Sequence, residues 1–373
     1  MALSYELASV PGFRAKAPGV QIGQYISADC SDDDLRLMQQ LGCEWAMVTG
    51  MDEAPELEVH TAENYLRIKE RFARFDVQVY RIAHHRVHNV PEITLNLPGR
   101  DERIDEYCRF TTELGKAGIH YNTYAHMATG IWSSGTTAGR GGTTARVFDP
   151  ETAVGHWNGR TFANEEMVHG RLYTEEELWE NYTYFIQKVA PVAEAAGVFI
   201  GIHPDDPPVY PLGGVPRALF GSFAGYCKAL EIADSPNIGA CLCLGCWLEG
   251  GKELMGADVF EAIRWFGGEN PMGQNKLFKV HFRNVSNPGD ANGGVWQESL
   301  LDEGYQDMAM VMKALTDVGF DGVAIPDHIP DFVSVGAGLA YSVAYMRALV
   351  QASSSLPAME DQIARGTFPE ARL

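Results

Sequence analysis

Four short stretches in the second half of the chain each end a strand-like apolar run with a side chain that can bind a metal ion. The four side chains are His203, Cys243, His281 and Asp327, and they are separated in turn by 40, 38 and 46 residues. Each interval matches about one strand-plus-helix unit of a β/α barrel, and a closed barrel gathers the C-terminal ends of its strands on the face that carries active sites. The spacing therefore predicts that these four remote residues meet at one point.

Two imidazoles, one thiolate and one carboxylate form a mixed soft and hard ligand set. Such a set suits Mn²⁺, Fe²⁺, Co²⁺, Ni²⁺ or Zn²⁺ better than Ca²⁺. A six-coordinate ion would keep positions open for substrate oxygens, whereas tetrahedral zinc would be closed by four protein ligands and structural. Each residue alone has a simpler interpretation, as a structural histidine or a small buried cysteine. The prediction of a metal site depends on the four together.

Polar residues lie directly beside these candidates in the sequence. Asp205 and Asp206 follow the first histidine and could orient it or bind substrate, or they could cap the next turn. His328 follows the aspartate and could act as a general acid or base near neutral pH. Arg283 lies on the same strand face as the second histidine and could clamp a substrate carboxylate, with an ion pair at the barrel mouth as the alternative.

Side chains after the third and fourth strand-like runs could form the wall of a sugar-sized polar pocket. They are His84, His85, His88, His126 and Trp132. Exposed loop residues unconnected with a site are the alternative interpretation. Cys241 and Cys246 flank Cys243 in a C-x-C-x-x-C run, but no fourth cysteine lies nearby, which disfavours a metal cluster.

The order of the predicted elements indicates the fold. Short apolar, β-branched runs alternate with helix-period runs, which is typical of parallel βα units. Strands are predicted at 22–28, 44–49, 77–83, 119–125, 198–203, 238–244, 277–283 and 322–326. Helices are predicted at 31–42, 61–75, 100–118, 174–197, 258–267 and 306–319, from caps, acidic first turns and terminal glycines. The expected architecture is one TIM (β/α)₈ barrel over residues 1–352, followed by a C-terminal arm at 353–373.

A long insertion, at about 127–173, follows the fourth predicted strand and contains the Gly-, Ser- and Thr-rich run SSGTTAGRGGTTAR (133–146). Its place after a strand puts it on the catalytic side of the barrel. A long loop there is a lid or a substrate-binding wall, and a flexible surface excursion is the alternative. The Gly-Arg-Gly-Gly sequence is not a phosphate loop, because no GK[ST] follows it.

The bulk composition excludes some classes of function. The formal net charge of −20 disfavours binding to nucleic acid. No segment approaches the roughly 18 apolar residues that span a bilayer, and the N-terminus does not read as a signal peptide. Seven cysteines, an odd number spread through the chain, suggest reduced thiols and a cytoplasmic protein without membrane association.

From about residue 90 to 350 the sequence resembles mannonate dehydratase, a family of metal-dependent sugar-acid dehydratases with a xylose-isomerase-like barrel. The likeness is strongest in EELWENYTYFIQKVAPVAEAAGVFIGIHPDDPP (176–208), VHFRN (280–284) and the PDH triplet at 326–328. The resemblance implies that an ion, usually Mn²⁺, is held by the four residues named first. It implies that His328 is the acid–base histidine, and that the chain assembles as a dimer or tetramer.

The chain departs from the family pattern around the expected substrate. Ile325 stands where the family has the arginine of RPDH, and Cys246 replaces the serine of C-x-G-S. Gln297 replaces a histidine, and the family's catalytic tyrosine falls near Ala337. Tyr341 is close by and is the predicted substitute, with Tyr124 or His126 as alternatives. We therefore expect a retained metal site within a changed substrate shell.

The function expected from these observations is the metal-dependent dehydration of a sugar acid, D-mannonate or a related hexonate, to a 2-keto-3-deoxy acid. The predicted catalytic residues are His328, Tyr341 and Arg283. Isomerisation, epimerisation, or lyase or hydratase chemistry on a keto-sugar is the alternative, because the same barrel and metal would serve it. A non-catalytic, metal-stabilised sugar-binding protein is a third possibility, and it requires a metal site with no open position.

Overall fold

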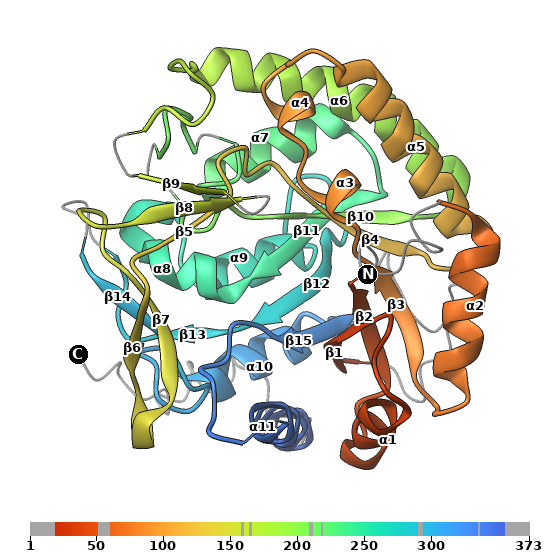
Figure 1. Ribbon diagram of the computed structural model, residues 1–373, viewed down its shortest axis with the longest axis vertical. Coiled ribbons are helices and arrows are strands. Elements are labelled where there is room, and N and C mark those ends of the chain that lie inside the picture. The colour runs from red at the N-terminus through yellow and green to blue at the C-terminus, as the bar shows by residue number, and fades with distance from the viewer. Residues whose placement is uncertain are drawn as a thin grey trace.

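The eight predicted strands form the centre of the molecule (Figure 1). The structure, a computed structural model, describes residues 19–50, 60–157, 160–163, 166–208, 212–217, 219–289, 294–334 and 336–354. The strands are β1 (Gln21–Ser27), β2 (Trp45–Thr49), β3 (Gln78–Ile82), β4 (Tyr121–Ala125), β10 (Phe199–His203), β11 (Ile238–Cys243), β12 (Leu277–Phe282) and β15 (Val323–Pro326). Each lies within two residues of its predicted bounds. The TIM-barrel prediction is confirmed.

All eight strands run parallel, in the order β3-β2-β1-β15-β12-β11-β10-β4. The seam between β3 and β4 is closed by side chains. The rings of Tyr80 and Tyr121 stack across it with centroids 4.5 Å apart. The hydroxyl of Tyr80 donates to the carbonyl of Phe278 at 2.8 Å, and so ties the seam to the opposite strand β12. The barrel interior at this level is a packed core of side chains, as in other barrels of this type.

Helices surround the strands. They are α1 (Asp32–Leu41), α2 (Ala62–Ala73), α5 (Arg100–Lys116), α6 (Glu175–Ala196), α7 (Phe223–Ala233), α8 (Leu244–Met255), α9 (Val259–Phe266), α10 (Met308–Asp317) and α11 (Ala337–Ser353), with short α3 (His85–His88) and α4 (Pro91–Thr94). All six predicted helices are present, and their caps explain why. Ser31 and Thr174 form capping boxes that begin α1 and α6, and left-handed glycines end both helices.

Five helices were not predicted: the short α3 and α4 and the longer α7, α8 and α11. The sequence of α8, LGCWLEGGKELM, carries three glycines, and glycine lowers helix propensity by about 1 kcal/mol per residue. Packing against β11 and β12 stabilises this helix where local propensity does not. Most of the predicted C-terminal arm lies outside the described residues.

The insertion after β4 is built of strands. It contains β5 (Ile131–Ser133), β6 (Thr136–Ala138), the 3₁₀ turn η4 (Arg140–Gly142), β7 (Thr144–Phe148), β8 (Val154–Trp157) and β9 (Arg160–Phe162). Strand β7 pairs antiparallel with β14 (Trp296–Ser299), which in turn pairs with β13 (Asn284–Val285) after β12. Figure 1 shows β6 and β7 beside β13 and β14, although about 150 residues separate them in sequence. In its described part the insertion therefore consists of paired strands, and its predicted role as a lid or substrate-binding wall stays a prediction.

Candidate active site

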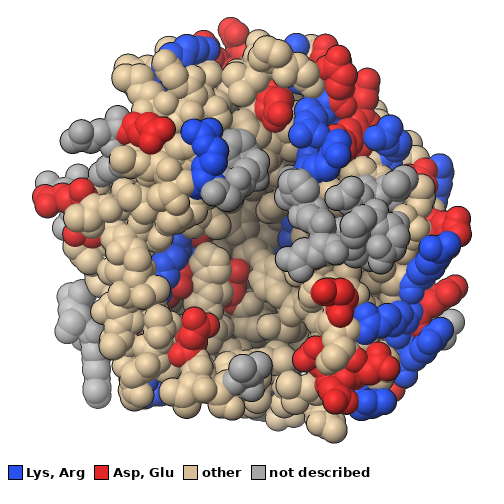
Figure 2. All heavy atoms as spheres, viewed as in Figure 1, with Lys and Arg blue, Asp and Glu red and all other residues tan. Residues whose placement is uncertain are grey.

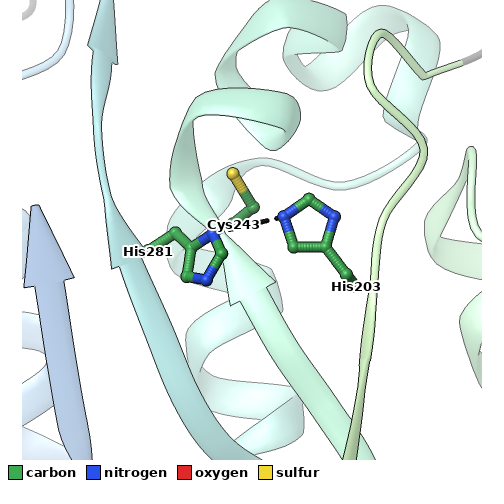
Figure 3. Close-up of side chains that lie close together, drawn as sticks. All are labelled: His203, Cys243 and His281. Atoms are coloured by element: carbon green, nitrogen blue, oxygen red, sulfur yellow. Dashed lines mark hydrogen bonds between the residues drawn. The ribbon is translucent and has the colours of Figure 1, made fainter. Parts of the chain in front are cut away.

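The first three metal-ligand candidates lie on neighbouring strands. His203 ends β10, Cys243 ends β11, and His281 lies on β12 directly opposite Cys243 in the strand register. One potential ligand atom from each lies within 4.8 Å of the other two, and all three side chains are buried. Figure 3 shows the imidazoles of His203 and His281 facing one another, with Cys243 beside them. Asp327, which directly follows β15, places Oδ2 3.5 Å from Nδ1 of His281 and 3.8 Å from Sγ of Cys243. We call these four residues the ligand cluster.

The two imidazoles of the ligand cluster are oriented by groups on their far sides. Nδ1 of His203 donates to the carbonyl of Pro204 at 2.6 Å, which leaves Nε2 to face Nδ1 of His281 at 3.2 Å. Nε2 of His281 in turn lies 2.8 Å from Nζ of Lys279 and 3.4 Å from the Tyr25 hydroxyl. Two atoms each bonded to one ion at about 2.1 Å are roughly 3 to 3.5 Å apart, so the spacing fits a shared ion. Orientation of ligand histidines by outer partners is usual in metal sites.

Both acidic members of the ligand cluster favour their anionic forms. Burial raises the pKa of Cys243, but the hydrogen bond from the Cys246 thiol and the charge of Arg283 hold it well below its ordinary value. Burial likewise opposes ionisation of Asp327, and its histidine neighbours, His328 first, hold its pKa well below the usual range. Thiolate and carboxylate are the forms that bind a cation. Donor types, spacing and charge therefore all fit a divalent transition-metal ion.

A second group of potential ligands lies next to the first. Atoms of Asp206, Cys246 and Glu249 also come within 4.8 Å of one another and are buried. The guanidinium of Arg283 binds all three: Nη1 lies 3.3 Å from Asp206, and Nη2 lies 3.2 Å from the Cys246 sulfur and 2.7 Å from Glu249. Gly245 makes room for it, because a Cβ there would lie 1.6 Å from Nε of Arg283. We call this group the arginine cluster. Its cation is the guanidinium of Arg283, a side chain of the protein itself.

The contacts of Arg283 differ from the predicted substrate clamp. Its side chain is fully buried, and Nη1 also binds Glu298 at 2.9 Å. Protein groups thus occupy both terminal nitrogens. This agrees with the alternative prediction of an ion pair, except that the ion pairs are buried. Arg283 holds the walls of the site together, and it does not present a free fork to a ligand.

His328 stands at the edge of both clusters. Its Nδ1 lies 2.7 Å from Oε1 of Glu298, and its backbone has a φ of 44°, the left-handed region that few non-glycine residues adopt. Its side chain is 33% exposed, whereas that of Glu298 is 4% exposed. Burial lowers the pKa of His328, but the charges of Asp327 and Glu298 raise it above its ordinary value. A partly open imidazole with one nitrogen anchored is suited to proton transfer.

The insertion contributes a residue that the sequence did not reveal. Arg146, on β7, binds Glu298 at 2.7 Å, Asp206 at 2.9 Å and Glu249 at 3.2 Å. It thereby connects the insertion to the segment after β10, to α8 and to β14. No motif marks Arg146 or Glu249, and Glu298 directly follows Gln297 in the sequence. Their pairing depends on strands that come together in the fold.

Three predicted wall residues are packed away from the ligand cluster. The ring of His126 lies among Tyr182, Phe185 and other aromatic rings, and burial lowers its pKa to about 3. Trp132 is buried, and its indole N–H donates to the Thr129 hydroxyl. The ring of His84 packs edge-on against another histidine, with centroids 4.8 Å apart.

Of the remaining predicted residues, Asp206 joins the arginine cluster, and Asp205, His88 and Tyr341 have other partners. Asp205 pairs with Arg217 at 3.2 Å. His88 binds the backbone of β4, and the side chain of His85 lies outside the described residues. Tyr341 lies on α11, and its hydroxyl donates to a carboxylate oxygen of Asp302 at 2.6 Å. No contact with the ligand cluster is seen for Tyr341 among the described residues.

In space-filling view, the molecule has a hollow near its middle, with basic and acidic side chains on its walls (Figure 2).

The sequence profile of the D-mannonate dehydratase (UxuA) family matches residues 30–358, most of the chain. This chain belongs to that family. Its family members are dehydratases, that is, hydro-lyases, and the resemblance seen in the sequence is confirmed.

Individual proteins agree with the family assignment. Mannonate dehydratase of Streptococcus agalactiae serotype V is 31% identical over 300 residues, which are 76% of this chain and 82% of that protein. The crystal structure of mannonate dehydratase from Streptococcus suis serotype 2 is similar in fold, with a TM-score of 0.73, 23% identity and coverage of 96% and 97% of the two chains. A xylose isomerase domain protein from Planctomyces limnophilus has a TM-score of 0.58 at 14% identity, over 91% of this chain and 99% of that one. The xylose-isomerase-like barrel is thus confirmed.

Among the described residues, no helix is both long and apolar enough to cross a lipid bilayer. All seven cysteines lie in the described part of the chain, and all seven are free thiols.

Proposed function

We propose that this protein is a metal-dependent dehydratase of a sugar acid, D-mannonate or a related hexonate, with a 2-keto-3-deoxy acid as product. The observation that carries the proposal is the ligand cluster. Four ligand-type side chains converge at the C-terminal ends of neighbouring barrel strands, beside a partly exposed histidine, in a member of the D-mannonate dehydratase family. Family membership supports the dehydration of a sugar acid, and the cluster supports the dependence on a metal.

His203, Cys243, His281 and Asp327 would hold the ion, for which we propose Mn²⁺, with Fe²⁺, Co²⁺, Ni²⁺ or Zn²⁺ also compatible with the donor set. When bound, a divalent ion would supply Lewis-acid stabilisation of the charge that develops on substrate oxygens. Four protein ligands leave open positions on a six-coordinate ion. This argues against the non-catalytic alternative, which requires a closed site.

Dehydration requires removal of the proton beside the carboxylate and protonation of the neighbouring hydroxyl as it leaves. We assign one of these proton transfers to His328, because its ring is partly open while Nδ1 is anchored. Arg283 and Asp206 would hold the wall of the substrate pocket through the arginine cluster. Tyr341 lies on α11 with its hydroxyl hydrogen-bonded to Asp302, so we assign it no proton transfer.

A second candidate function, isomerisation or epimerisation of a keto-sugar, is favoured by one observation. Ile325, which replaces the family's arginine, is fully buried and packs in the barrel core with Val323 and Phe278. The position therefore offers no cation to a substrate carboxylate. A substrate without a carboxylate would fit this change.

The deciding experiment incubates Mn²⁺-loaded protein anaerobically with D-mannonate and assays 2-keto-3-deoxygluconate. We expect product from the wild type and none from Cys243→Ala or His281→Ala. Wild-type protein that carries metal but forms no product from D-mannonate or other hexonates would refute the dehydratase proposal. Turnover of a keto-sugar in the same screen would then support the second candidate.

The cytoplasmic location and the homo-oligomeric assembly expected from the sequence stay predictions.

A further inference from the structure

Glu298 occupies an unusual position beside the proposed acid–base histidine. One of its oxygens, Oε1, is approached by three donors: Nδ1 of His328 at 2.7 Å, Nε of Arg146 at 2.7 Å and Nη1 of Arg283 at 2.9 Å. The side chain is buried, and β14 carries it, where pairing with β7 fixes the backbone. Each of the three donors comes from a different segment of the chain.

The contacts of Nδ1 set the position of the proton on His328. This nitrogen lies close to two groups of opposite character, the Glu298 carboxylate at 2.7 Å and Nη1 of Arg283 at 2.8 Å. A carboxylate only accepts a hydrogen bond and a guanidinium only donates one. Where the carboxylate dominates, Nδ1 carries the proton and Nε2 keeps a lone pair. Where the guanidinium dominates, Nδ1 becomes the acceptor and the proton moves to Nε2.

We infer that Glu298 is the positioning residue that fixes His328 in the tautomer protonated at Nδ1, with Nε2 directed to the substrate pocket. The inference rests on the proposed function, in which His328 exchanges protons with the substrate. Glu298 draws Arg283 to the same oxygen, and so keeps the guanidinium from competing for Nδ1 as a donor.

Asp206 provides a matched comparison within the same network. It binds the same two arginines, Arg146 at 2.9 Å and Arg283 at 3.3 Å, and it is equally buried. Its described hydrogen bonds do not include His328. A role limited to balancing the charge of the arginines would make Glu298→Gln and Asp206→Asn behave alike. A positioning role would separate them.

The first measurement is the tautomer of His328 by nitrogen NMR of zinc-loaded protein labelled with ¹⁵N-histidine, with the resonance assigned by its loss in His328→Asn. We expect the Nδ1-protonated form in the wild type and in Asp206→Asn. In Glu298→Gln, we expect the Nε2-protonated form, because the amide group and Arg283 both offer donors to Nδ1. The same tautomer in wild type and Glu298→Gln would overturn the inference, as would a change in Asp206→Asn equal to that in Glu298→Gln.

The second measurement separates turnover from binding. Where a carboxylate holds a catalytic histidine, replacing it by an amide lowers kcat by up to about 10⁴-fold through the wrong tautomer. For Glu298→Gln we expect a kcat loss of about 10² to 10⁴-fold, with KM and metal content within about threefold of wild type. A loss that appears in KM or metal content, with kcat retained, would overturn the inference. If the wild type turns over no sugar acid, the proposed function fails, while the NMR comparison still decides the role of Glu298.

Discussion

The ligand cluster and the arginine cluster contain the same kinds of side chain but differ in their source of positive charge. Each brings three potential metal ligands within 4.8 Å, and both are buried at the same end of the barrel. In the arginine cluster, the guanidinium of Arg283 already binds all three members. In the ligand cluster, two imidazole nitrogens face one another at 3.2 Å beside a thiol and a carboxylate. Proximity of ligand types therefore does not define a metal site, and the charge that the protein itself supplies separates the two.

The protonation of the two clusters follows this difference. Burial raises the pKa of Glu249 well above its ordinary value, so this carboxyl favours its neutral form even beside two arginines. Cys243 and Asp327, in contrast, have lowered pKa values despite their burial. The arginine cluster neutralises itself, whereas the ligand cluster keeps negative charge for an added cation.

The largest expected effect is on metal binding. We expect one ion per chain in the wild type, and a loss of affinity of at least about 100-fold in Cys243→Ala, since loss of outer partners alone costs about 10 to 100-fold. The control Glu249→Gln removes a carboxyl from the arginine cluster and should keep one ion per chain. Equilibrium dialysis with Mn²⁺ and elemental analysis measure both. Two ions in the wild type, one of them lost in Glu249→Gln, would erase the distinction between the clusters.

The next largest effect is expected on stability, when the guanidinium of Arg283 is removed from the arginine cluster. Arg283→Met leaves buried Asp206 and Glu298 each without one of its cationic partners, and breaking a buried ion pair in this way costs about 3 to 5 kcal/mol. The control Arg140→Met breaks an exposed pair with Asp302, worth at most about 1 kcal/mol. Urea unfolding of the two variants compares them. Equal free energies of unfolding would show that the arginine cluster does not support the fold.

A smaller perturbation crowds the arginine cluster without removing charge. A methyl group at Gly245 would lie 1.6 Å from Nε of Arg283, so Gly245→Ala must displace a fully buried side chain. Overpacking of this kind costs about 1 to 3 kcal/mol. In the double variant with Arg283→Ala the clashing Cδ, Nε and Cζ atoms are absent, so the losses of the two single variants should be less than additive. Additive losses in urea unfolding would place the effect of Gly245 elsewhere.

The smallest expected effect concerns a buried imidazole outside both clusters. Burial among aromatic rings lowers the pKa of His126 to about 3, below the ordinary value of about 6.5. The unfolded chain therefore binds a proton that the folded protein excludes, so stability falls as pH drops from about 6.5 toward 3. Between pH 7 and 5, we expect wild type to lose about 1 to 2 kcal/mol more than His126→Phe. Parallel stability–pH curves for the two proteins would contradict this.

Sequence alone determined the barrel and the composition of the ligand cluster. Hydrophobic period, capping residues and terminal glycines are local properties, so the eight strands and six helices could be predicted. Each of the four residues of the ligand cluster lies within one residue of the C-terminal end of a strand, and the barrel topology brings parallel strand ends together without further information.

Only the tertiary structure decided the surroundings of that cluster. Arg146, Glu249 and Glu298 come from an insertion, a glycine-rich helix and a strand that pairs across about 150 residues, and none has a local signature. For the same reason, Arg283 was predicted to clamp a substrate, whereas in the structure it is the buried cation of the arginine cluster. A side chain's chemistry can be predicted from its type, but its partner depends on which remote segments pack against it.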